Sequence, residues 1–225
     1  MLDGFLIARA LSDFLFGFGT FFAIINPYGL AFVFLDRTRS LSDAERGRIA
    51  RLIAGYSLIV LAVSLLFGSA ILGFFGVSLP ALRIAGGLVV AFAGWSMLNA
   101  PEAEAEPLAI AAGGFDVVRR MAFFPLTIPL TTGPGTIAAA IALGATRNDP
   151  GGHPLPALVG SLLAAFAAAL TVWHAYRRAG LMARLVGAEG TRVITRLSAF
   201  LLLCVGVEII LTGVADALRP LLQSR

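Results

Sequence analysis

Two short segments each interrupt a long apolar run, and they occupy corresponding places in the two halves of the chain. The first is residues 26–29, Asn-Pro-Tyr-Gly, and the second is residues 131–135, Thr-Thr-Gly-Pro-Gly. Proline and glycine at membrane depth leave backbone groups without partners, and such a break is tolerated where protein or a water-filled cavity supplies new ones. Matched broken helices are typical of the binding sites of transporters. The two segments therefore predict a site.

The composition is that of a membrane protein. Of the 225 residues, 58% are hydrophobic and 13% are charged, and the mean hydropathy is +0.89. Soluble domains carry about 25% charged residues. Six spans of about 20 residues fill the chain, so we predict one membrane domain over residues 1–225 without a further soluble domain. No small-residue cleavage site follows a short apolar segment at the N-terminus, so we expect the first helix to be retained.

Six apolar stretches bounded by charged residues predict six transmembrane helices. They cover residues 14–35, 49–72, 82–98, 121–143, 155–176 and 194–214. The third and sixth stretches align without a gap, which places Arg83 on Arg196 and Trp95 on Glu208. The alignment indicates an internal duplication.

Each half contains three helices, an odd number, so the second half enters the bilayer inverted relative to the first. We predict an all-α, polytopic fold of two inverted-topology repeats, in which helices one and four are broken. The repeats cover about residues 10–100 and 118–218. The connection between them, about residues 101–117, begins with a proline and three glutamates and reads as a flexible linker.

The arginines predict the orientation. All 17 basic residues are arginine, and the formal net charge is +4. Twelve of them fall in the loops after the first, third and fifth spans. The positive-inside rule places these loops in the cytoplasm and both termini on the extracytoplasmic side. Because the basic excess lies in loops, we expect no nucleic-acid partner.

The first break follows from the chemistry of three residues. Pro27 has no N–H and its ring crowds the preceding turn, while Asn26, as the residue before proline, is pushed out of helical geometry. Gly29 then allows a second half-helix over residues 30–35. The first N–H groups of that half-helix lack internal partners and are suited to an anion.

The second break offers a complementary set of groups. Pro134 frees the carbonyl of Leu130, and the neighbouring glycines leave the backbone open to a ligand. Three threonines add hydroxyls. Donors, acceptors and small polar side chains at one depth suit a zwitterion with a carboxylate and an ammonium, such as a small amino acid. The predicted substrate-binding residues are Asn26, Pro27, Gly29, Thr131, Thr132, Gly133, Pro134, Gly135 and Thr136.

A single proline often only kinks a transmembrane helix. The pairing of two breaks within a duplication is what favours a site. Pro125 and Pro129, upstream in the fourth span, are expected merely to bend it.

Glu208 is the only acid deep inside a predicted span, where a carboxylate costs about 2.5–3.5 kcal/mol on insertion scales. This cost makes it a candidate for proton coupling or for binding a substrate ammonium. The alternative is a protonated carboxyl that bonds a neighbouring helix. Asp13 and Asp216 lie near helix ends and are expected at the interface. Neither histidine has a second ligand at metal spacing, Cys204 is a single cysteine, and no catalytic triad or phosphate-binding loop is present, so we expect no metal, cofactor or enzyme activity.

Three motifs carry a resemblance to a known family. They are Ile-Asn-Pro-Tyr-Gly at residues 25–29, Leu-Arg-Ile-Ala-Gly-Gly at 82–87 and Ile-Pro-Leu-Thr-Thr-Gly-Pro-Gly-Thr-Ile at 128–137. In combination they resemble the MarC family, the multiple-antibiotic-resistance-related integral membrane proteins, over nearly the whole chain. The chain departs from the family by lacking a proline soon after the first break. The family also admits glutamine at the position of Glu208, which weakens the case for an obligatory proton carrier there.

The resemblance implies a small, six-span protein of the bacterial inner membrane. Family members with an assigned activity move glycine, alanine and other neutral amino acids, with proton coupling implied. The leading hypothesis is therefore a secondary transporter of small neutral amino acids that works by alternating access, with membrane lipid and a second copy of the chain as further possible partners. The alternatives are a passive channel, an exporter of another small solute, and, last, a membrane-embedded enzyme or regulatory scaffold.

Overall fold

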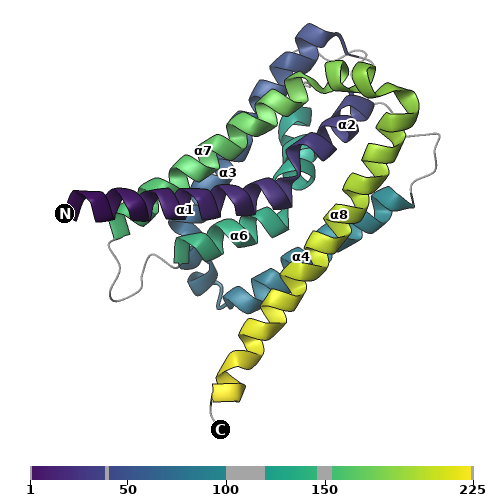
Figure 1. The fold of residues 1–225 in the computed structure, drawn as a ribbon. Helices are drawn as coiled ribbons and strands as arrows, with labels where there is room; N and C mark the ends of the chain where they lie inside the picture. The colour runs from purple at the N-terminus through teal and green to yellow at the C-terminus, as the bar shows by residue number, and fades with distance from the viewer. Residues whose placement is uncertain (1, 39–40, 100–119, 146–153, 224–225) are drawn as a thin grey trace.

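The computed structural model describes residues 2–38, 41–99, 120–145 and 154–223, and in these residues every regular element is a helix. Figure 1 shows their arrangement. The helices are α1 (Leu2–Ile25), α2 (Pro27–Arg37), α3 (Asp43–Phe74), α4 (Leu79–Leu98), the π-helix η1 (Ala122–Thr131), α6 (Pro134–Ala145), α7 (Pro154–Arg177) and α8 (Ala179–Gln223). The predicted linker over residues 101–117 lies outside the described residues.

Within the described residues, five helical stretches are long and apolar enough to cross a membrane. They are Leu6–Arg37, Asp43–Phe74, Leu79–Leu98, Leu155–Arg177 and Glu189–Arg219. The pair formed by η1 and α6 makes a sixth if it is counted as one span, and it is bent by 70°. The all-helical, polytopic fold with a broken fourth span is thereby confirmed.

Several helices extend beyond the predicted apolar stretches because polar turns continue them. The start of α3 is set by a capping box: the Ser42 hydroxyl accepts a hydrogen bond from the Glu45 amide, and the Ser42 amide donates to the Glu45 carboxylate at 2.9 Å. The start of α8 lies far upstream of the predicted sixth span, and the helix is kinked at Gly187, where φ is 77°. Glycine adopts this angle without steric cost.

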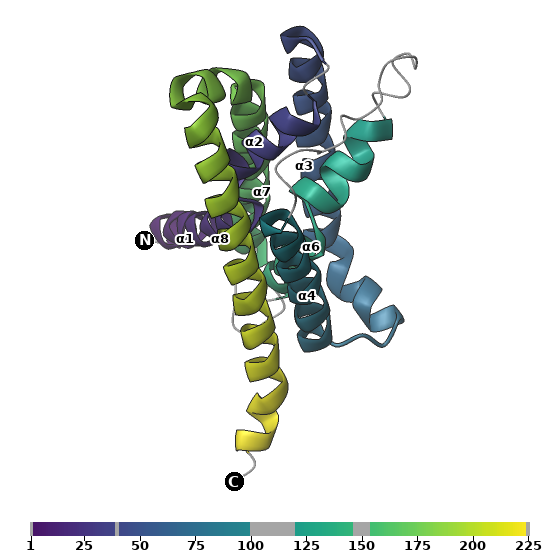
Figure 2. The ribbon, with the colours of Figure 1, turned by 90° about the vertical axis from the view of Figure 1, so that its right-hand side faces the viewer.

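The third helices of the two halves, α4 and α8, pack along each other, as Figures 1 and 2 both show. Glycines permit their close approach. A Cβ atom at Gly87 would lie 2.7 Å from the Gly206 carbonyl oxygen, and one at Gly94 would lie 2.5 Å from the Leu203 amide nitrogen. Small residues at a helix interface let backbones approach in this way in membrane proteins. The α4–α8 pair is therefore joined by backbone contact.

The remaining contacts repeat when the two halves are exchanged. Helix α7 packs against α1 and α2, and the equivalent α3 packs against η1 and α6. In the same way α8 contacts α2, and α4 contacts α6. This is the packing that a duplicated three-helix unit would produce.

The protein interior and its surface both fit a membrane environment. Phe34 of α2 stacks on Tyr176 of α7, with ring centroids 4.6 Å apart, and both side chains are fully buried. Large apolar side chains remain exposed on the outer faces, including Phe92 and Leu15. Exposed apolar surface on this scale is typical of a face that contacts lipid.

Candidate functional site

The first break is confirmed, and it is confined to one residue. Helix α1 ends at Ile25, and α2 begins directly with Pro27. Asn26 between them adopts a left-handed conformation with φ 45° and ψ 58°, which asparagine tolerates better than most residues. The second half-helix therefore starts three residues earlier than the predicted 30–35. The hydrogen-bond ladder resumes at once, since the Leu30 amide donates to the Asn26 carbonyl at 2.9 Å.

Gly29 is the point of closest contact at the first break. A Cβ atom there would overlap the Ser198 hydroxyl of α8 and would lie 2.5 Å from the Asn26 side-chain nitrogen. Ser198 is buried and Asn26 is half-buried. Only glycine fits between these two polar side chains in this arrangement.

The second break involves a longer distortion. Helix η1 is a π-helix in which Phe124 and Ile128, each of which precedes a proline, have non-helical backbone angles. Threonine side chains satisfy the backbone here: the Thr127 hydroxyl donates to the Ala122 carbonyl at 2.6 Å, and the Thr131 hydroxyl donates to the Leu126 carbonyl at 2.7 Å. The span therefore leaves helical geometry at the residues before Pro125 and Pro129, which is a larger distortion than the bend expected there.

Neighbouring helices hold the second break in place. The Thr132 hydroxyl donates to the Ser57 hydroxyl of α3 at 2.8 Å, and the Thr131 and Tyr176 hydroxyls lie 2.9 Å apart. On the other side, a Cβ atom at Gly86 of α4 would lie 3.0 Å from the Pro134 carbonyl oxygen. Each break is therefore contacted by the third helix of the other half: the first by α8 and the second by α4.

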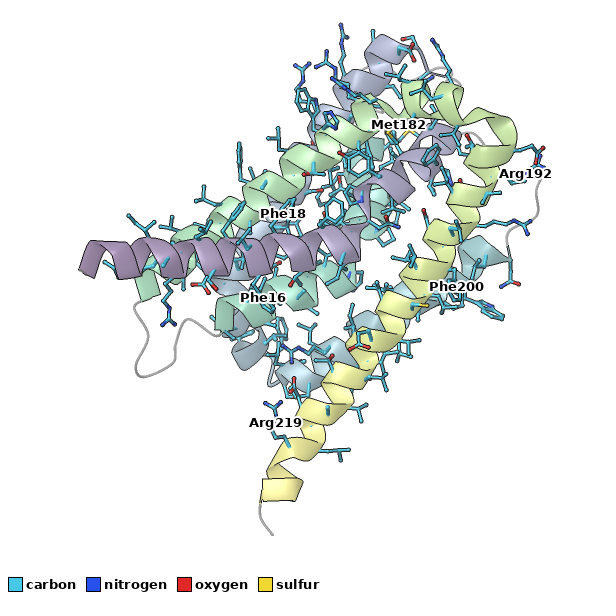
Figure 3. The ribbon with its side chains drawn as sticks, in the orientation of Figure 1. Phe16, Phe18, Met182, Arg192, Phe200 and Arg219 are labelled. Carbon is cyan, nitrogen blue, oxygen red and sulfur yellow. The ribbon has the colours of Figure 1, made fainter. Side chains whose placement is uncertain are left out.

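Two cavities adjoin the second break, and we call them cavity 1 and cavity 2. Cavity 1 has a volume of about 430 Å³ and includes Asp13, Arg83, Gly135 and Glu208 in its lining. Figure 3 shows Phe16, which also lines cavity 1, on the face of α1 opposite Phe18. Cavity 2 has a volume of about 400 Å³, and its lining includes Arg37 as well as Thr131, Gly133, Pro134 and Thr136. Both are in the size range of small-molecule sites.

The cavities lie toward opposite ends of the same helices. Along α4, Arg83 lines cavity 1 and Met97 lines cavity 2, and at 1.5 Å per residue these positions are about 21 Å apart. Along α8 the order is reversed, with Leu202 at cavity 2 and Thr212 at cavity 1. Ile24, which lies two residues before Asn26, lines both. The second break and Ile24 thus stand between the two cavities.

The structure brings together only part of the predicted site. Four of the nine substrate-binding candidates line cavity 2 and Gly135 lines cavity 1. Thr132 is buried and its hydroxyl is bonded to Ser57, so it lines neither cavity. The residues of the first break also line neither cavity; they are Asn26, Pro27 and Gly29. At the first break the sequence predicted Asn26, Pro27 and Gly29 as binding residues, whereas the residue that lines the cavities is Ile24, just before the break.

The acidic residues also differ from expectation. Glu208 is exposed on the wall of cavity 1 and not buried among helices, because this face of α8 is not covered by α4. Asp13, expected at the interface, lines the same cavity, and its Oδ2 atom is buried with no hydrogen-bond partner among the described residues. It was missed because α1 begins at Leu2, which places Asp13 well inside the helix.

The one cation in the described lining of cavity 1, Arg83, is already engaged. Arg83 of α4, which lines cavity 1, forms an ion pair with Asp216 of α8. Arg219, at the lower end of α8 in Figure 3, lies 3.7 Å from the other oxygen of Asp216. Asp13 and Glu208 are the acids that remain in the lining. Within the described residues, no group of three or more metal-ligating side chains is present.

Comparison with known proteins identifies the family. A family model described as "MarC family integral membrane protein" matches residues 11–218. This chain belongs to the MarC family. The UPF0056 inner membrane protein MarC of Salmonella typhimurium is 35% identical over 204 residues, which cover 87% of this chain and 91% of that protein. The protein of the same name from Escherichia coli O6:H1 is 34% identical with the same coverage. No solved structure matches this chain.

Membership in the MarC family fits the geometry described above. The matched region begins just before Asp13 and ends just after Asp216, so it contains both breaks and both cavities. The relatives are named as inner membrane proteins. The chain is accordingly a MarC-family integral membrane protein whose broken fourth span separates two cavities.

Proposed function

We propose that this protein is a secondary transporter of small neutral amino acids, of the glycine, alanine and serine class, and that it works by alternating access. The observation that carries the proposal is the pair of cavities at opposite ends of the helices, with the second break and Ile24 between them. A site held between two cavities is what alternating access requires, because it is exposed to one side and then to the other. A passive channel would instead need one continuous path.

The groups around the second break and in cavity 1 support a zwitterionic substrate. Asp13 and Glu208 in cavity 1 supply carboxylates for an ammonium group. Gly133 and Gly135 at the break carry no side chain that would separate the backbone from the cavities they line, so backbone polar groups there are available to a substrate carboxylate. Small neutral amino acids carry both charges and little side chain, which fits cavities of about 430 and 400 Å³.

Proton coupling is part of the proposal. A carboxyl group in a cavity within a membrane protein is a recurrent proton carrier. Glu208 is exposed to cavity 1 and Asp13 has a buried, unpartnered oxygen there. Either one can bind a proton when the substrate ammonium is absent. We further propose that the arginine-rich loops are cytoplasmic and both termini extracytoplasmic, on the strength of the arginine distribution.

The test is counterflow of labelled alanine in proteoliposomes preloaded with a panel of amino acids, with and without a pH gradient. We expect saturable exchange with glycine, alanine and serine, and acceleration by the gradient. Exchange with none of the amino acids, by protein that elutes as a single folded species, would overturn the substrate class. Non-saturating flux would favour the channel.

Substitutions of Asp13 and Glu208 test whether these acids carry the coupled proton. We expect the double variant Glu208→Gln/Asp13→Asn to remove the response to the pH gradient and to weaken exchange, because it removes both carboxylates of cavity 1. The control is Glu189→Gln, which changes an exposed acid on the same helix that pairs with Arg192 outside cavity 1. An unchanged pH response in the double variant would contradict proton coupling through cavity 1.

A further inference from the structure

A third, polar pocket of about 450 Å³ lies where the start of α3 meets the end of α7 and the start of α8. Its lining shares no residue with cavities 1 and 2. This corner is at the top of Figure 1, and nitrogen-tipped side chains gather there in Figure 3. Its charged lining residues are Asp43, Arg48, Arg51, Arg177 and Arg184. Four guanidinium groups thus face a single carboxylate.

The one carboxylate is already occupied. Asp43 accepts a hydrogen bond from Arg46 at 2.8 Å through Oδ1, and its Oδ2 lies 3.7 Å from the guanidinium of Arg184. A Cβ atom at Gly180 would lie 3.4 Å from the bonded Arg46 nitrogen. The Asp43 carboxylate is therefore shared between Arg46 of α3 and Arg184 of α8. It does not neutralise the other arginines of the pocket.

Arg48 and Arg51 form no close ion pair among the described residues, and Arg48 acts on the Glu45 carboxyl only from a distance, through its charge. Arg48 and Arg51 are three residues apart and share one face of α3. In the described part of the chain, neither has an ion-pair partner within 4.0 Å. The nearby Glu45 carboxylate is held by the Ser42 amide and hydroxyl at 2.9 and 2.6 Å. Like charges that share a pocket repel one another, and an anion between them would relieve this repulsion.

Apolar groups border the pocket on its outer side. The Arg177 guanidinium lies over the Trp173 ring at 5.3 Å from the ring centre. Leu181 lines the pocket and is 54% exposed, and Leu185, one turn further along α8, is 78% exposed. A tryptophan beside arginines at the end of a span is typical of the level of lipid head groups. The pocket thus combines cationic groups with an adjacent surface for acyl chains.

We propose that this pocket binds the phosphate head group of an anionic phospholipid, with Arg48, Arg51 and Arg177 as its ligands. Guanidinium groups donate paired hydrogen bonds to phosphate oxygens and keep their charge at any physiological pH. Basic pockets between transmembrane helices bind anionic head groups in this way. The exposed leucines beside the pocket favour a lipid over a soluble phosphate. This function is separate from transport, because none of these residues lines cavity 1 or cavity 2.

The test is thermal unfolding of the purified protein in neutral detergent. Phosphatidylglycerol, phosphatidylcholine or sn-glycerol 3-phosphate is added to the wild type, to the Arg48→Gln/Arg51→Gln variant and to a control, Arg120→Gln/Arg178→Gln. The control removes two exposed arginines that do not line the pocket. We expect phosphatidylglycerol alone to raise the melting temperature of the wild type and the control, and to leave that of the pocket variant unchanged.

Two results would overturn the proposal. An equal response to phosphatidylglycerol in the pocket variant and the control would show diffuse attraction to negative charge. An equal response of the wild type to glycerol 3-phosphate would assign the pocket to a soluble anion.

A second measurement needs no change in the pocket and covers the case in which the variant does not fold. In a Trp95→Phe background, Trp173 is the only tryptophan. Stronger quenching of its fluorescence by brominated phosphatidylglycerol than by brominated phosphatidylcholine supports the proposal, and equal quenching contradicts it.

Discussion

The two breaks share a proline at the start of the following half-helix, yet their backbones differ. The first consists of Asn26 alone, and α1 and α2 together still form one apolar stretch, Leu6–Arg37. The second extends over a π-helix and two further residues, and the chain bends there by 70°. The difference teaches that the extent of a break depends on what precedes the proline. Two further prolines precede the second break, whereas none precedes the first within its helix.

The two breaks also differ in what surrounds them. The first is packed against α8 through Gly29 and Ser198 and lines neither cavity. The second has its hydroxyls bonded on one side and opens to a cavity on the other. We infer that the first break acts as a packed support and the second as the moving barrier. The following predictions test this division, from the largest effect to the smallest.

Gly133→Leu should abolish counterflow while leaving membrane insertion intact. A Cβ atom at this position would lie 2.7 Å from the Pro129 carbonyl oxygen, and backbone cannot yield as a side chain can. The control is Gly55→Leu on α3, where a Cβ atom would meet no atom within 4 Å. Wild-type exchange in Gly133→Leu would show that the second break is not the barrier.

Gly29→Ala should reduce transport through misplacement of α8, and a second change, Ser198→Gly, should restore it. The added methyl group overlaps the Ser198 hydroxyl, so removing that side chain makes room on the α8 side, and the end of the flexible Asn26 side chain can shift away on the other. In a double-mutant cycle read by thermal unfolding, we expect a coupling free energy of about 0.5–3 kcal/mol, as for other residues in contact. Additive effects would indicate that Gly29 is required for substrate contact instead of packing.

Asn26→Ala should lower the free energy of unfolding by about 1–2 kcal/mol, because alanine pays the steric cost of the left-handed conformation. Asn26→Gly should avoid that cost. Asn26 is the only non-glycine residue with a positive φ in the described chain, so no residue of the second break has an equivalent sensitivity. Counterflow by Asn26→Gly therefore measures what the side-chain amide of Asn26 contributes to transport. Loss of exchange in a stable Asn26→Gly protein would show that this amide contacts the substrate.

Thr132→Val should have the smallest effect, a loss of about 1 kcal/mol in the free energy of unfolding, which is typical of one hydrogen bond between transmembrane helices. Its hydroxyl is bonded to Ser57 of α3 at 2.8 Å. Thr171→Val is the control, since that hydroxyl bonds only within its own helix, to the Ala167 carbonyl. A complete loss of exchange by well-folded Thr132→Val would place this hydroxyl in the transport path.

Much of the fold was predictable because its signals are local. Apolar stretches long enough to span a bilayer marked six spans, and proline next to a residue that tolerates unusual backbone angles marked both breaks. The π geometry of η1 was not foreseen. In it the hydroxyls of Thr127 and Thr131 donate to carbonyls five residues earlier. The sequence does not show whether a threonine hydroxyl bonds its own segment or a neighbouring helix, as that of Thr132 does.

The candidate site was predictable only in part. Gly133 and Gly135 were selected for their place in the break, and both line cavities. Asp13 and Ile24 have no distinguishing sequence pattern, and only the packing of α1 against α6 and α7 shows that they face cavity 1. Glu208 was expected to be buried, but burial of one helix face depends on which helix covers it.

The sequence by itself determined the class of this protein, its spans, its duplication and the positions at which two helices break. Hydropathy and proline stereochemistry act over a few residues, so one chain suffices to read them. The tertiary structure alone decided that one break is packed and the other adjoins two cavities, that Asp13 joins Glu208, and that arginines far apart in the chain share a pocket. These properties arise from contacts between distant segments, which are set by how whole helices pack and not by any local pattern.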